Sequence, residues 1–113
     1  MASVRPVYTP DSLEQARASV RAFSDLCMSS IPAPSALAIS QACEVLDTLG
    51  TKPSKVMVDV SGGVCIEYRG AESEFVVYCD DEGSIVVSVD SERFDELACA
   101  AQVADYAVPA TAA

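Results

Sequence analysis

Carboxylates and thiols are the side chains of this sequence that could do chemistry, because the chain contains no histidine. Without histidine it lacks the commonest general base, the commonest metal ligand and every Ser-His or Cys-His nucleophile pair. Its odd number of cysteines, with no Cys-x-x-Cys pair and no export signal, predicts reduced thiols in a cytoplasm, buried as small hydrophobes. These cysteines are Cys27, Cys43, Cys65, Cys79 and Cys99.

Three arrangements could support a reaction or a metal ion, and each has a simpler explanation. Cys65 is expected on an outer strand face beside Arg69, whose charge would lower the pKa of a thiol. Paired carboxylates such as Asp59 and Glu67 could serve acid–base chemistry only inside a walled cleft. The acidic residues 80–82 lack the alternating ligands of a calcium loop and favour a hairpin turn. We therefore expect no catalytic residue, no metal site and no cofactor.

Acidic residues dominate the charge of the chain, with 17 Asp and Glu against 7 Lys and Arg. Residues 1–58 hold five of each sign, so the whole excess lies in residues 59–113, where two arginines face twelve acids. Such a chain cannot build the basic patch that binds nucleic acid directly. An acidic field instead accelerates encounter with a cationic protein surface. Solubility and helix capping explain the same acids without a partner, and both interpretations stay open.

Two helices are predicted in the first half of the chain. The first has Thr9 as its N-cap, runs to about Met28 and carries apolar residues at spacings of three and four, namely Leu13, Ala16, Val20, Phe23 and Cys27. The second starts at Pro34 or Ser35 and ends at Gly50, where a left-handed C-cap is favoured. Because the connection between them is short and contains two prolines, we expect a helical hairpin.

Four strands and a last helix are predicted in the second half. Apolar residues alternate with period two over residues 55–60, 64–69, 74–79 and 84–89, and every gap contains glycine. Asp90 or Ser91 is expected to cap a helix with the apolar stripe Phe94, Leu97, Ala101, Ala104 and Val108. The fold class is therefore α+β, with a helical hairpin, a four-stranded antiparallel meander and a C-terminal helix. Residues 1–113 form one domain, frayed over 1–8 and 109–113.

On this fold the excess acids are expected to gather into one patch over the outer sheet face, its turns and the start of the last helix. Tyr78 is the expected aromatic anchor of the same face. A second copy of the chain, forming a homodimer, could cover this face instead of another protein. The predicted partner-binding residues are Asp59, Glu67, Glu72, Glu74, Tyr78, Asp80, Asp81, Glu82, Glu92, Asp95 and Glu96. No apolar run is long enough to cross a bilayer.

Residues 56–68 resemble the first hairpin of small α+β proteins encoded by phages and other mobile elements. There, an alternating strand meets a glycine-containing turn and then the pattern hydrophobic-x-hydrophobic-Glu-aromatic, here Ile66-Glu67-Tyr68 after Gly62-Gly63. In size, acidity and fold class the chain also resembles the anti-CRISPR inhibitors of that group. The resemblance implies a non-enzymatic inhibitor in the host cytoplasm that binds a Cas subunit and excludes DNA.

Type III secretion chaperones are the alternative, since they too are small, acidic, cytoplasmic α+β proteins. They are usually dimers, and they hold an extended segment of another protein. That resemblance implies a chaperone or adaptor that binds a peptide through the apolar sheet face. The chaperones place a helix between their third and fourth strands, for which the short turn of residues 80–83 leaves no room.

Overall fold

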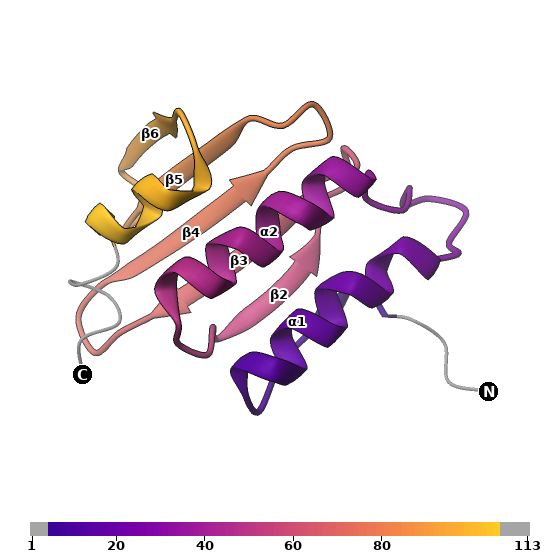
Figure 1. Cartoon of the computed structure of the whole chain (residues 1–113), viewed down its shortest axis with the longest axis horizontal. Coiled ribbons are helices and arrows are strands. Elements are labelled where there is room, and N and C mark those ends of the chain that lie inside the picture. Colours follow the sequence, from indigo (N-terminus) through magenta and orange to yellow (C-terminus); the bar gives the residue numbers. More distant parts are fainter. Residues whose placement is uncertain (1–4, 107–113) are drawn as a thin grey trace.

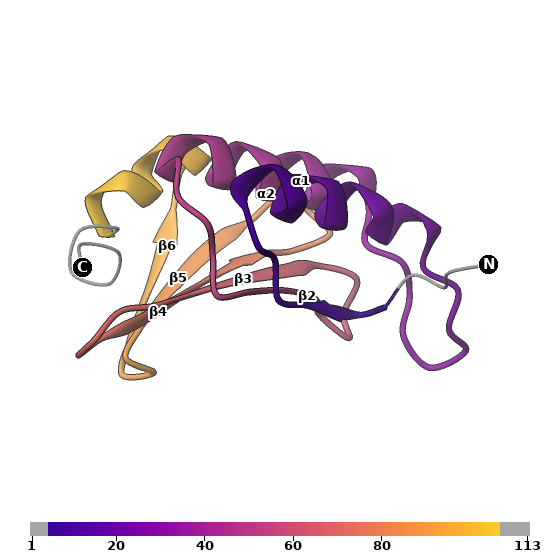
Figure 2. The same cartoon turned by 90° about the horizontal axis from the view of Figure 1, so that it is seen from below.

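A six-stranded antiparallel sheet forms one layer of the computed structural model, which describes residues 5–106, and helices form the other layer (Figure 1). The strands lie side by side in chain order from β1 to β6. Figure 2 shows α1 and α2 on one side of the sheet, and no described helix lies on the other, which we call the open face. The elements are β1 (Val7–Tyr8), α1 (Leu13–Ala22), the 3₁₀ helix η1 (Phe23–Asp25), α2 (Ala36–Leu49), β2 (Lys55–Val58), β3 (Val64–Arg69), β4 (Glu74–Cys79), β5 (Ile85–Val89), β6 (Arg93–Leu97) and the 3₁₀ helix η2 (Ala100–Val103).

Period-two alternation places the apolar side of each central strand against the helices, as predicted. A row of four residues that lie directly opposite one another across β2 to β5 is fully buried, and α2 covers it with small and branched side chains. Burial of this row and of α2 removes apolar surface from water, which is the main free energy that holds the two layers together. The row is Val56, Ile66, Val77 and Val87, and its cover is Ala38, Ala42, Val45 and Leu46.

The two predicted helices are confirmed, with a shift in the first. The hydroxyl of Ser35 caps α2 by accepting the N–H of Ala38, and Gly50 ends it with a φ of 65°. In α1 the cap is Ser12 rather than Thr9, because Ser12 Oγ accepts the N–H of Gln15. The α-helix ends at residue 22 and η1 at residue 25, so the predicted end at Met28 is wrong. Residues 27 and 28 are exposed.

The segment predicted to start the last helix is a fifth long strand, so the expected four-stranded sheet is wrong in its strand count. Asp90 and Ser91 form a turn instead of a helix cap, with the N–H of Glu92 donating to Val89 O. Residues 93–97 then pair in register with β5. Because the outer edge of β5 offers unpaired backbone groups, strand pairing satisfies them where a helix would not. In the described chain after β5, helical structure is confined to residues 100–106.

Residues 1–8 were expected to fray, but this prediction is wrong for Val7 and Tyr8, because they pair with β2 as a sixth strand. The Tyr8 ring lies 5.9 Å from the ring of Phe23, which joins the strand to the helical layer. A strand of two residues has no alternation for a pattern to detect. Of the other residues predicted to fray, 1–4 and 109–113 lie outside the described residues, as does Val108 of the predicted apolar stripe.

Ser35 joins the start of α2 to two turns of the sheet. Its N–H donates to Gly62 O in the β2–β3 turn, and its Oγ donates to Asp81 O in the β4–β5 turn. Gln41 adds a third link, through Nε2, to Gly83 O. These bonds fix one end of the sheet beneath the N-terminus of α2.

Replacement of Ser91 by glycine is expected to stabilise the protein. Asp90 and Ser91 have φ values of 52° and 59°, a region that costs residues with a side chain about 1 kcal/mol or more relative to glycine. Ser91→Gly should therefore raise the free energy of unfolding by about 1 kcal/mol in urea denaturation. Ser91→Ala serves as the control and should give no gain. A lower stability of Ser91→Gly would contradict the assigned turn.

Gly63→Ala should destabilise the protein more than Gly50→Ala does. A Cβ at residue 63 would overlap the carbonyl oxygen of Cys79 and lie 3.1 Å from Asp80 Cα, whereas a Cβ at residue 50 meets nothing within 4 Å. We expect a loss of about 3 kcal/mol for Gly63→Ala, from overlap with backbone, and about 1 kcal/mol for Gly50→Ala, from its positive φ. Equal losses in thermal unfolding would refute this close approach of β3 and β4.

Candidate binding surface

The open face carries one row of apolar side chains that crosses five strands. The strand register places them directly opposite one another, in the order Val7, Met57, Cys65, Tyr78 and Val86. Val76 and Phe94 stand in the next row, on either side of Ser88. Three of these side chains are well exposed, Val7 at 47%, Tyr78 at 38% and Phe94 at 62%. Within residues 5–106 no element covers them.

An uncovered apolar row of this kind is typical of a protein-binding surface. Helices bury the other side of the same sheet, so the exposed aromatics on the open face are not needed for the core. Surfaces that bind proteins combine an apolar centre and aromatic anchors with a polar border. The open face has that composition, with Tyr78 near its centre and Glu96 at the end of the row on β6.

The acidic side chains do not gather into one patch, so that expectation is wrong. Antiparallel connections alternate between the two ends of a sheet. The β2–β3 and β4–β5 turns, with Asp59 and residues 80–82, therefore lie at one end, and the turns with Glu72 and Glu92 lie at the other. The six residues of β4 separate the two ends by about 17 Å, at about 3.3 Å per residue.

Arginines within the second half of the chain neutralise three of the predicted acids. Arg69 pairs with Glu67 at 3.1 Å and with Glu74 at 2.8 Å on the open face. The pKa of the Arg69 guanidinium is raised by its hydrogen bond to Glu74 and by the charges of both carboxylates. Asp95 stands opposite Val87 on the helix side of the sheet and pairs with Arg93 at 2.7 Å. Asp95 is therefore not part of the open face.

Two of the remaining acids are engaged in turns. Asp80 Oδ1 accepts the N–H groups of Glu82 and Ser84, which makes this carboxylate a structural part of the β4–β5 turn. The Asp59 carboxylate accepts the hydroxyl of Ser61. The other predicted acids are exposed and make no ion pair within residues 5–106; they are Glu72, Asp81, Glu82, Glu92 and Glu96.

Cys65 was the one thiol whose place beside Arg69 could have lowered its pKa, and the structure buries it. It does lie on the open face, but its neighbours bury it, and Arg69 binds the carboxylates instead. Burial, with a smaller contribution from Asp59, raises the pKa of Cys65 to about 12. Burial also raises the pKa of Cys79 to about 12. Both groups are thus protonated thiols near neutral pH, and thiols are weak nucleophiles.

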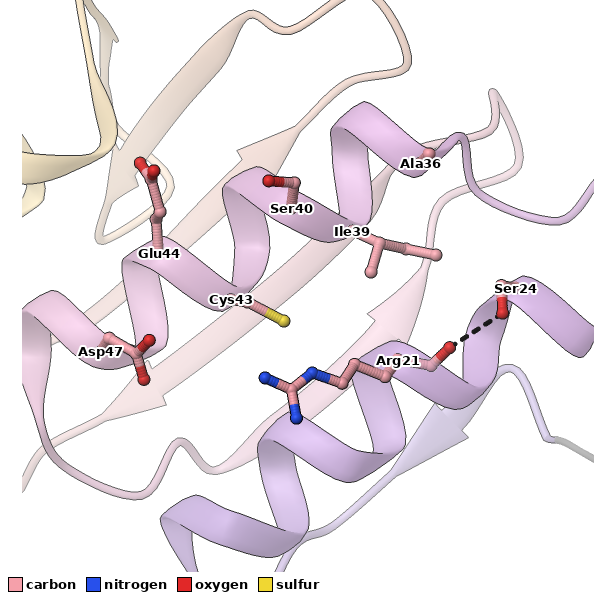
Figure 3. A pocket seen from close by; sticks show the side chains of 8 residues that line it. All are labelled: Arg21, Ser24, Ala36, Ile39, Ser40, Cys43, Glu44 and Asp47. Atoms are coloured by element: carbon pink, nitrogen blue, oxygen red, sulfur yellow. Dashed lines mark hydrogen bonds between the residues drawn. The ribbon is translucent and has the colours of Figure 1, made fainter.

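A shallow groove of about 460 Å³ lies between α1 and α2 on the outer surface of the helical layer (Figure 3). Arg21 reaches from α1 toward Cys43 and Asp47 of α2, and Ile39 also lines the groove. Burial raises the pKa of the Cys43 thiol, and Arg21 opposes that shift. Sequence reasoning missed this groove, because its residues come from separate helices, so no local pattern marks it.

No group of three or more Cys, Asp or Glu within residues 5–106 could hold a metal ion. The described helices include none that is both long and apolar enough to cross a membrane.

Comparisons of the chain with models of protein families, with curated proteins and with solved structures give no match. The candidate site therefore stands on the geometry of the open face.

Alkylation should separate four of the five thiols by their burial. Cys27 and Cys99 are exposed, whereas Cys65 and Cys79 are buried with raised pKa values. At pH 8, iodoacetamide should modify Cys27 and Cys99 quickly and reach the two buried thiols only after unfolding, as read by peptide mass spectrometry. Rapid labelling of Cys65 in the folded protein would show that the open face is not packed as described.

Proposed function

We propose that this protein is a non-enzymatic binding protein that docks its open face on a basic surface of another protein. The observation that carries the proposal is the uncovered apolar row with Tyr78 near its centre. Binding surfaces draw most of their affinity from a few central aromatic anchors, while charged residues around them act on encounter and on the choice of partner.

The charge of the molecule supports a basic partner. The chain has a formal net charge of −10, and its exposed acids stand at both ends of the sheet that bears the apolar row. They therefore border the open face on two sides, although they do not form one patch. Long-range attraction of this kind raises the association rate with a cationic surface and decreases with salt.

Basic protein surfaces commonly bind nucleic acids, because neutralised phosphates supply much of the affinity. A partner of this kind, held by the open face, would lose access to its nucleic acid. The protein would then act as an inhibitor by occupancy in the cytoplasm. The most specific form of this proposal names a Cas subunit as the partner. The resemblance in size, acidity and fold class to anti-CRISPR proteins supports it.

Capture from an extract of the native host tests the proposal. Immobilised protein should retain a basic protein at about 50 mM salt and much less of it at about 500 mM. Tyr78→Ala should reduce recovery about ten-fold or more through loss of the anchor. Asp81→Lys combined with Glu96→Lys should reduce recovery chiefly at low salt. Added nucleic acid should compete with the immobilised protein for the same partner.

Matched variants on the helical layer provide the controls. Leu37→Ala removes an exposed apolar side chain of α2, and Glu14→Lys combined with Glu44→Lys reverses two exposed acids of α1 and α2. Both control variants should capture the partner as the unmodified protein does. Recovery that is unchanged by Tyr78→Ala and by the reversals at residues 81 and 96 would refute docking through the open face.

A further inference from the structure

The surroundings of Tyr78 are apolar and acidic, and no lysine or arginine within residues 5–106 lies over its ring. On the open face its direct neighbours are Cys65 on β3 and Val86 on β5, and Asp80 follows in the turn after β4. Burial raises the pKa of the Tyr78 hydroxyl, and the charges that act on it, from Asp59, Glu74 and Glu67 among others, are all negative. The nearest arginine of this face, Arg69, is bound to carboxylates.

Elsewhere in this chain, an arginine contacts both a tyrosine ring and a carboxylate. The guanidinium of Arg93 lies over the ring of Tyr106, 5.5 Å from its centroid. Asp95 pairs with Arg93 at 2.7 Å and raises the pKa of the Tyr106 hydroxyl. An aromatic ring, a carboxylate and a cation thus form one unit on the helix side of β6. The open face presents the Tyr78 ring with Asp80 two residues further along the chain and with Asp59 among the charges that act on the ring, and neither carboxylate has an ion pair within residues 5–106.

We propose that Tyr78 is the docking point for a cationic side chain of the partner, arginine by preference, which lies over the Tyr78 ring while apolar neighbours of that arginine contact Met57 and Val86. The negative face of an aromatic ring attracts a cation, and arginine adds planar stacking. The inference rests on the proposed function and specifies the chemistry that the partner must present.

A second copy of this chain fits the surface poorly. It would bring a second set of acids against the first, and like charges across an interface are unfavourable. Of the two cations on the open face, Arg69 is already bound and only Lys55 has no ion pair within residues 5–106. Lys55 is thus the cation of the open face that a second copy could place on Tyr78 without breaking an ion pair within residues 5–106, which makes that alternative testable.

Graded fluorination of the ring at residue 78 tests the inference. The probe is a short capped peptide of alternating arginine and valine, and its control is the same peptide with citrulline, which keeps the shape of arginine without the charge. Binding is followed by backbone amide shifts of the isotope-labelled protein. We expect Tyr78→Phe to bind as the unmodified protein does, and a trifluorinated phenylalanine at residue 78 to bind about five-fold more weakly or worse. The citrulline peptide should bind about ten-fold more weakly.

Three results would overturn the inference. Equal binding by the fluorinated and unfluorinated rings would show that no cation lies on the ring. Amide shifts confined to β6, or to the groove between α1 and α2, would place the peptide at a sheet edge or on the helical layer. A dimer in sedimentation that Lys55→Gln dissociates would assign the face to a second copy. Should a fluorinated protein not fold, Tyr78→Phe against Tyr78→Leu replaces it, with weaker binding expected for leucine only.

The outcome separates this inference from the proposed function. Loss of extract capture in Tyr78→Ala, together with no effect of fluorination, would leave the docking face in place and reject the cation on the ring. Extract capture that does not respond to Tyr78→Ala would reject the docking face itself.

Discussion

Burial of one side of the sheet against α2 is the constraint on which the rest of the structure depends. The row Val56, Ile66, Val77 and Val87 has no exposed surface, and the covering helix meets it mostly with alanine and valine, which lets the layers approach closely. Because alternate residues of a strand point to opposite faces, the same register that buries this row fixes what the open face shows. The apolar row through Tyr78 is a consequence of that register.

The antiparallel connections decide how the charge of the chain is distributed. A carboxylate in a turn goes to one end of the sheet or the other according to the position of that turn in the chain, whatever its distance in sequence from other acids. Ser35 fixes the end that carries the Asp81 turn beneath α2. Acids near the N-terminus of a helix are also favourable to the helix dipole, so part of the charge excess serves the fold.

The open face and the acidic ends therefore have separate physical roles. Exposed carboxylates act over distances of about a Debye length and are screened by salt, whereas the apolar row acts only on contact. The surface of the proposed partner would therefore combine basic residues, which attract the carboxylates, with apolar residues, which contact the apolar row. The unit of Arg93, Asp95 and Tyr106 shows that this chain already places one arginine between a tyrosine ring and a carboxylate.

The sequence by itself determined the local elements with a strong period or a strong cap. Alternation located β2 to β5 within one or two residues, and Ser35 and Gly50 marked the ends of α2. Tyr78 was placed on the outer face by the same alternation. These features depend on residues that are close together in the sequence, so a sequence pattern can reveal them.

Only the tertiary structure decided that β1 and β6 form, and which candidate side chains are buried or ion-paired. Residues 94, 97, 101 and 104 have helical spacing, yet pairing with the edge of β5 made the first two part of a strand, because that edge supplies hydrogen-bond partners that no local pattern records. Likewise, the burial of Cys65 and the ion pairs of Arg69 depend on which strands lie side by side. The excess of acidic residues could be counted in the sequence. Their arrangement in space could not be predicted, because the order of the turns decides at which end of the sheet each acid lies.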